Sequence, residues 1–104
     1  MTRTTGKLTT IRALLERDPV CRGIVCYFVD HSEAADTARG IAEWWVDRAV
    51  TATAEALFKL EGLGVVCAYP VHDSSTVYGF TKNPLLRQSL RHYVDETFRV
   101  AEAR

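Results

Sequence analysis

Two of the three histidines lie near carboxylates, a pairing that general acid–base catalysis uses. His31 precedes Glu33 and Asp36. His72 is followed directly by Asp73. A histidine beside a carboxylate at a helix end or in a turn is more often a solvated pair than a catalytic one, and the sequence has no GxSxG, HExxH or glycine-rich phosphate motif. We therefore expect no enzyme activity and no catalytic residue.

The three cysteines are the remaining candidates for metal or redox chemistry. Cys21, Cys26 and Cys67 are odd in number and have no CxxC spacing. On a helix, the five-residue interval between Cys21 and Cys26 turns their side chains about 140° apart, so they cannot hold one metal ion together. We expect reduced thiols that pack as small apolar side chains, with no metal and no cofactor.

Length and composition indicate one folded domain. The chain has 104 residues, of which 47% are apolar and 25% charged. Its apolar runs are too short for a transmembrane helix, and the first residues, MTRTTGK, lack the apolar segment of a signal peptide. We expect a cytoplasmic protein that does not contact a membrane.

A helix that runs into a strand is predicted for residues 51–66, TATAEALFKLEGLGVV. Leu57, Leu60 and Gly64 recur at spacings of three and four, which is typical of a narrow apolar stripe on a helix. Glycine at the end of the stripe gives the backbone the freedom to leave the helix. Phe58 lies next to the stripe, and we expect it to pack in the core or against another helix rather than to stack on a base.

Two helices separated by a proline are predicted for the N-terminal third. Apolar residues have helical spacing in residues 8–17, and Asp18-Pro19 ends that helix because proline disfavours the α conformation in the residue before it. Pro19 can then open a second helix with an apolar face that extends to about His31. The run GIVCYFV also fits a buried strand, but no turn residue interrupts this segment, and we expect a helix.

A third helix is predicted to begin after Asp36, which is a suitable N-cap. It contains Trp44 and Trp45, whose side chains point about 100° apart on a helix, so we expect one in the core and the other at an edge. Asp47-Arg48 is predicted to form the turn that follows. Asp47 or Thr51 would then cap the next helix.

A β-hairpin and a last helix are predicted for the C-terminal part. Residues 65–69 and 76–81 are rich in strand-forming residues, and the turn-rich segment 70–75 separates them. Asn83 is a suitable N-cap and Pro84 a suitable first residue for the last helix. The expected chain order is therefore α-α-α-α-β-β-α, an α+β fold.

Three segments of this pattern resemble the winged helix-turn-helix domains of bacterial regulators of the MarR/PadR type. LEGLGVV resembles the end of the recognition helix, Ile41-Ala42 the hydrophobic pair of the second helix, and residues 77–81 the second wing strand. The resemblance implies a winged helix with a hairpin wing and additional helices at both ends. Its parts would be an N-terminal arm and helix (1–18), the winged-helix core (19–81) and a C-terminal helix (82–104).

The resemblance implies that the protein binds double-stranded DNA and regulates transcription, with the third core helix in the major groove. The residues on the exposed side of that helix, in the wing turn and in the N-terminal arm are the expected DNA contacts: Arg48, Thr51, Ala52, Glu55, Lys59, Ser74, Arg3 and Lys7.

The charge of the core favours a different partner. Residues 36–81 contain three basic and six acidic residues, a net charge of −3, whereas residues 1–17 contain four basic and one acidic residue. Neutralisation of DNA phosphates by basic side chains supplies most of the non-specific affinity for DNA. A net negative charge in residues 36–81 therefore weakens the DNA hypothesis. The alternative is a winged-helix module that binds a protein partner.

The last helix is predicted to join two copies of the chain in a homodimer. Its apolar row is wider than a small domain can cover, and an uncovered row favours association, to which residues 8–15 would also contribute. The expected interface residues are Leu86, Leu90, Tyr93, Val94 and Thr97. In the competing arrangement this row folds back onto the same chain and leaves a monomer.

Overall fold

The computed structural model describes residues 2–71, 73 and 75–98, with side chains from residue 7. These residues form five α-helices, one of them continued by a π-helix, and a three-stranded antiparallel sheet. The α+β class is confirmed. None of the helices in these residues has the length and apolar character needed to cross a membrane. The elements are α1 (Thr2–Arg17), α2 (Pro19–Asp30), β1 (Ala35–Thr37), α3 (Ala38–Gly40), the π-helix η1 (Ile41–Val46), α4 (Val50–Gly62), β2 (Val66–Pro70), β3 (Thr76–Phe80) and α5 (Pro84–Phe98).

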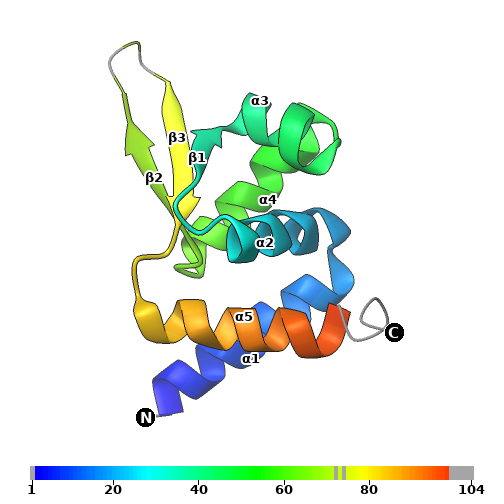
Figure 1. Ribbon diagram of the computed structural model, residues 1–104, viewed down its shortest axis with the longest axis vertical. Coiled ribbons are helices and arrows are strands. Elements are labelled where there is room, and N and C mark those ends of the chain that lie inside the picture. Colours follow the sequence, from blue (N-terminus) through cyan, green and yellow to red (C-terminus); the bar gives the residue numbers. More distant parts are fainter. Residues whose placement is uncertain (1, 72, 74, 99–104) are drawn as a thin grey trace.

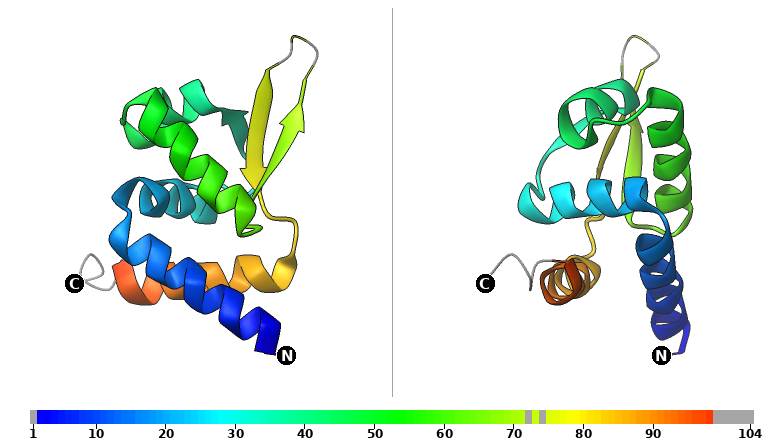
Figure 2. Two further views of the ribbon diagram at one scale, coloured as in Figure 1. Left: turned by 180° about the vertical axis from the view of Figure 1, so that it is seen from behind. Right: turned by 90° about the vertical axis from the view of Figure 1, so that its right-hand side faces the viewer.

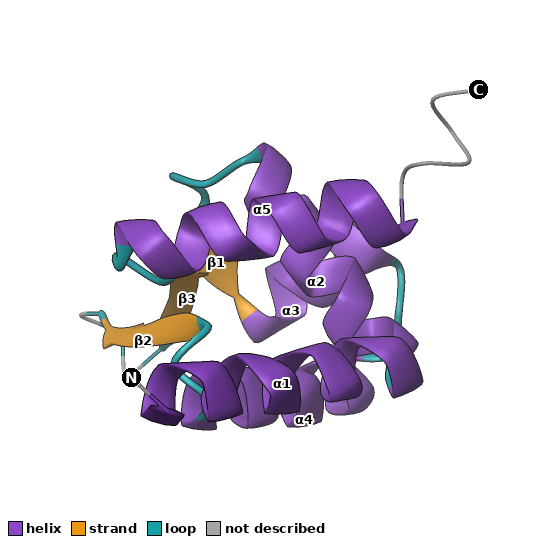
Figure 3. Ribbon diagram, turned by 90° about the horizontal axis from the view of Figure 1, so that it is seen from below, coloured by secondary structure: helices purple, strands orange, loops and turns teal. Residues whose placement is uncertain are grey.

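The molecule has two ends that differ in structure. The hairpin β2–β3 projects from one end, beside α3 and the start of α4, whereas α1 and α5 lie at the other end (Figures 1 and 2). Seen from below, α1 and α5 lie on opposite sides of α2 (Figure 3). Helix α2 is therefore the central element, and we expected this segment to be a helix.

The core is built on the apolar side chains of α2. Cys21, Ile24, Val25, Phe28 and Val29 are all at most 1% exposed. They pack in one cluster with apolar side chains of α1, α4, α5 and the sheet. At the predicted helix start, the Asp18 carboxylate accepts hydrogen bonds from the backbone amides of residues 20 and 21, at 3.0 and 3.2 Å.

Helix α5 folds back onto the same chain, which corrects the predicted dimer interface. Leu90 and Val94 are fully buried and Tyr93 is 6% exposed, within the core cluster that also includes residues of α1 and α2. Leu86 is half-buried against that cluster, and Thr97 is exposed. The apolar row indicated correctly that this face is covered, but periodicity cannot identify the covering surface.

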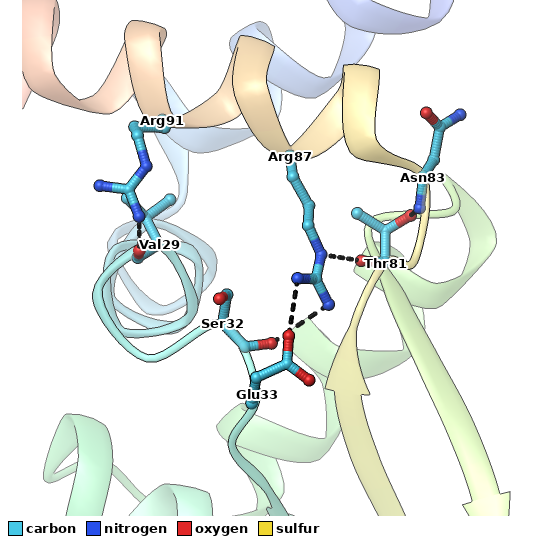
Figure 4. Close-up of polar contacts among 7 residues, drawn as sticks. All are labelled: Val29, Ser32, Glu33, Thr81, Asn83, Arg87 and Arg91. Atoms are coloured by element: carbon cyan, nitrogen blue, oxygen red, sulfur yellow. Dashed lines mark hydrogen bonds and ion pairs between the residues drawn. The ribbon is translucent and has the colours of Figure 1, made fainter.

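Two arginines of α5 bind the C-terminal end of α2 (Figure 4). Arg91 donates to the carbonyl of Val29 at 2.6 Å, and Arg87 donates to the carbonyl of Ser32 at 3.2 Å and to Glu33 at 3.0 Å. The hydrogen bond from Arg87, reinforced by its charge, lowers the pKa of Glu33. These contacts satisfy carbonyls near the end of α2 and place positive charge at the negative end of its dipole.

The sheet contains one strand that was not predicted. β3 pairs with β2 as expected of a hairpin, with Val66 opposite Phe80, and its other edge pairs with β1, where Ala35 lies opposite Gly79. Strand β1 has three residues and no alternation of apolar side chains, so its sequence carries no strand signal. It exists because β3 offers an edge for pairing.

Two of the predicted helix caps are wrong and one is confirmed. Asp36 lies in β1, and the Thr37 hydroxyl accepts from the amide of residue 40 instead. Helix α4 begins after Ala49 without a side-chain cap, because Asp47 takes a left-handed conformation (φ 54°) that ends η1. At α5 the Asn83 side chain accepts from the amides of residues 85 and 86, as expected.

Three aromatic predictions have different outcomes. Trp45 is half-buried and stacks on Tyr27 with ring centroids 4.2 Å apart, whereas Trp44 is 81% exposed, so one tryptophan packs inward as expected. Phe58 was expected in the core or against another helix and is instead 76% exposed. Thr53, Ala56, Leu57 and Leu60 form the buried face of α4, and Phe58 lies about 100° round the helix from Leu57.

Gly40 provides the first test of the local structure. Its φ and ψ are helical (−61° and −43°), but a Cβ at this position would overlap the carboxylate of Asp36, which accepts a hydrogen bond from the amide of residue 37. We expect Gly40→Ala to stabilise the Asp36→Ala variant by about 0.5–1 kcal/mol, through helix propensity, but not to stabilise the wild type. Urea unfolding of the four proteins measures this coupling.

Gly62→Ala is the matched control, because a Cβ there has nothing within 4 Å. It should leave stability unchanged or raise it in both backgrounds. Equal effects of Gly40→Ala with and without Asp36 would contradict the close approach of the carboxylate.

Candidate nucleic-acid interface

The exposed face of α4 is set by the side chains that the helix buries. Because Thr53, Ala56, Leu57 and Leu60 point inward, Thr51, Glu55 and Phe58 fall on the opposite side at spacings of four and three. Ala52 is half-buried at the edge of this face, and Arg48 is exposed directly before the helix. The structure therefore places three of the predicted contacts, Thr51, Ala52 and Glu55, on or beside one side of α4, and Arg48 is exposed two residues before the helix.

The hairpin and the start of α3 border a shallow hollow. The hollow has a volume of about 410 Å³. Thr37 and Arg39 line one side of it, and Ser75, Thr76 and Tyr78 of the hairpin line the other. Arg39 also forms an ion pair with Glu43 at 3.2 Å, in which its side chain remains 72% exposed. A guanidinium among hydroxyl groups can contact a phosphate.

Arg39, Thr37, Ser75 and Thr76 were absent from the predicted contacts. The residue types that favour phosphate binding are visible in the sequence, but their proximity depends on β1 pairing with β3. Because β1 has no sequence signal of its own, nothing in the sequence placed Arg39 next to the hairpin.

Lys59 is exposed one turn after Glu55 and has a partner at the start of α2. Its ammonium is 3.3 Å from the carboxylate of Asp18, the N-cap of α2. Partial burial opposes ionisation of Asp18, but hydrogen bonds from the Cys21 amide and from Lys59 outweigh this effect and lower the pKa of the carboxyl group. Lys59 thus forms an ion pair that joins α4 to the start of α2, and its predicted role as a major-groove contact stays a prediction.

Among the predicted contacts in the N-terminal arm and the wing turn, the structure describes the side chain of Lys7, which lies away from this surface. Lys7 is exposed and lines a hollow with Leu8, Gly64 and Leu85, at the end of the molecule opposite the hairpin. The side chain of Arg3 and residue Ser74 lie outside the described residues. Next to Ser74, Asp73 has a lowered pKa because the side chain and the amide of Ser75 hydrogen-bond to it, so the hairpin turn carries negative charge.

Among the described residues, the histidine and cysteine side chains do not gather in one place. His31 is exposed and packs on the ring of Tyr27, with centroids 4.3 Å apart. Burial raises the pKa of the Cys21 thiol to about 12, which makes it unreactive near neutral pH. Among the described residues there is no group of three metal-binding side chains.

No protein-family model matches this chain, and no significant match was found among curated proteins. The arrangement of the side chains is therefore the basis for any functional inference.

Substitutions of Asp18 and Lys59 separate two roles of the Asp18 carboxylate, the capping of α2 and the ion pair with Lys59. We expect Asp18→Ala to lower the free energy of unfolding by about 0.5–2 kcal/mol at neutral pH, because two amides of α2 lose their acceptor. Lys59→Ala should cost less, under about 1 kcal/mol, because the ion pair is partly exposed to solvent. Chemical denaturation of the wild type and both variants measures the difference.

The effect of Asp18 should also depend on pH in a defined direction. Because the pKa of Asp18 is lowered from its ordinary value of 3.8 by folding, its stabilising effect is complete above that value and is lost as the pH falls through the folded-state pKa. The gap between wild type and Asp18→Ala should therefore narrow in acid. A gap that stays constant or widens in acid would contradict this account.

Proposed function

We propose that the chain is a winged-helix protein that binds double-stranded DNA and acts as a small transcriptional regulator. In this proposal α2, η1 and α4 are the three core helices, α4 enters the major groove and the β2–β3 hairpin is the wing. The observation that supports it most is the position of α4, whose first turns lie at the end of the molecule from which the hairpin projects (Figure 1). A third strand, β1, joins the hairpin to the segment before α3.

Phosphate contacts would come from two places, the start of α4 and the hollow that Arg39 lines between α3 and the hairpin. Arg48 precedes α4, whose N-terminus has no capping side chain, so a phosphate there meets both the guanidinium and the positive end of the helix dipole. Arg39 would contact a second phosphate. Its exposed ion pair with Glu43 is worth at most about 1 kcal/mol, and a phosphate can replace the carboxylate.

Base contacts would come from the first turns of α4. The Thr51 hydroxyl can hydrogen-bond a base edge, Glu55 can accept from the amino group of cytosine, and the Ala52 methyl can contact thymine. A glutamate in this place also repels phosphate. We therefore expect weak non-specific binding, with affinity that depends on a matching base sequence.

A second candidate function is contact with a protein partner, and the charge of the same surface favours it. Of the three basic residues between 36 and 81, two are paired with carboxylates, Arg39 with Glu43 and Lys59 with Asp18. The exposed face of α4 also combines Glu55 with the exposed ring of Phe58. A partner of this surface would be basic with apolar side chains, rather than a phosphate backbone.

The salt dependence of DNA binding distinguishes the two candidates. With two phosphate contacts per chain, the affinity for DNA should fall by about tenfold between about 50 and about 200 mM salt. This corresponds to a slope near −2 in a plot of the logarithm of the binding constant against the logarithm of the salt concentration. Arg39→Ala and Arg48→Ala should each reduce the magnitude of that slope by about 1. Fluorescence anisotropy with random and genomic duplexes measures both quantities.

Lys82→Ala is the matched control, because Lys82 is exposed but lies between β3 and α5, away from α4. It should leave the slope of the wild type unchanged. Absence of binding to any duplex at the lower salt concentration would contradict the DNA proposal and favour the protein partner. A slope that all three variants reduce equally would indicate diffuse charge attraction instead of the proposed contacts.

A further inference from the structure

An apolar groove lies between α1 and the C-terminal half of α4. The groove has a volume of about 640 Å³. It is lined on the α1 side by Thr10, Leu14 and Arg17, and at the end of α4 by Phe58, Gly62 and Leu63. Leu63 also lines the hollow that contains Lys7, Leu8, Leu85 and Leu86, so the two depressions share a wall and extend along α1 to the start of α5.

Two of the most exposed apolar side chains of the described residues lie along this groove. Phe58 is 76% exposed and Leu85 is 72% exposed. Each projects beside a hollow that is itself lined by apolar side chains. The surface thus carries both the projecting groups and the depressions that such groups fill.

We propose that this groove binds a second copy of the chain and forms a two-fold symmetric dimer. In an isologous interface the same surface faces itself, so a suitable surface must be complementary to itself. The groove meets this condition in shape, because Phe58 and the depressions lie on one face. The charges of the groove are also complementary to themselves. Arg17 lies on the α1 side and Glu61 on the α4 side, so a two-fold axis can bring Arg17 of each copy opposite Glu61 of the other.

The proposed interface differs from the α5 row that the sequence indicated. It uses the C-terminal half of α4, whereas the proposed base contacts Thr51, Ala52 and Glu55 lie in the first turns of that helix. Leu90 and Val94 are fully buried within the chain and take no part. The hairpin and the hollow around Arg39 lie at the other end of the molecule from α1 (Figure 1). The inference does not rest on DNA binding, and a failure of one leaves the other standing.

Sedimentation velocity over a hundredfold range of protein concentration, reaching high micromolar values, tests the proposal. The wild type should shift from monomer to dimer, and Phe58→Glu should weaken dimerisation by at least about tenfold, because it places a charge in the apolar groove. Trp44→Glu is the matched control, since Trp44 is equally exposed but lies in η1, away from the groove. Circular dichroism checks that each variant keeps its helical signal.

A charge exchange tests the symmetry of the interface. Arg17→Glu and Glu61→Arg should each weaken the dimer, and the two changes combined in one chain should restore it, because every pair across the axis then has opposite charges again. A wild type that stays monomeric at the highest concentration, or a dimer that Trp44→Glu disrupts and Phe58→Glu does not, would overturn the proposal. A double variant with additive losses would contradict pairing of Arg17 with Glu61.

Discussion

The burial of one short helix, α2, is the constraint on which the rest of the structure depends. Its apolar residues pack against α1, η1, α4 and α5, so each of these helices is positioned by the same twelve residues. The ring of Phe28 stacks on Phe80 of β3 at 5.5 Å and meets the edge of Trp45 at 5.0 Å. Phe28 therefore contacts both the sheet and the π-helix, and Tyr27 of α2 adds a second contact to Trp45.

Polar contacts fix both ends of this central helix. Asp18 caps its first turn and pairs with Lys59 of α4, whereas Arg87 and Arg91 of α5 bind carbonyls near its last turn. Arg87 also donates to the carbonyl of Thr81 and packs over the ring of Phe80. The basic residues at these positions thus stabilise the fold, and residues 36–81 contain only three basic residues beside six acidic ones.

The sequence predicts the elements whose signals are local and misses the features that depend on tertiary contacts. The spacing of Leu57 and Leu60, the Asp18-Pro19 junction and the Asn83 cap each act within a few residues, and the structure has all three as expected. Strand β1 forms only because β3 has a free edge, and Arg39 was missed with it. Leu90 was assigned to an external partner, and the ion pair of Lys59 with Asp18 was missed, because helical spacing identifies a face but not the group that covers it.

The central claim is that the first turns of α4 and the adjoining hairpin form one surface that contacts a DNA duplex. An NMR titration of the isotopically labelled protein with a duplex tests it most directly, because each backbone amide reports its own environment. The account predicts that the largest shift changes occur at residues 48–55 and 75–77, with a smaller group at Arg39, while residues 7–17 and α5 change little. Shift changes confined to the groove between α1 and α4, or no changes at low salt, would contradict it.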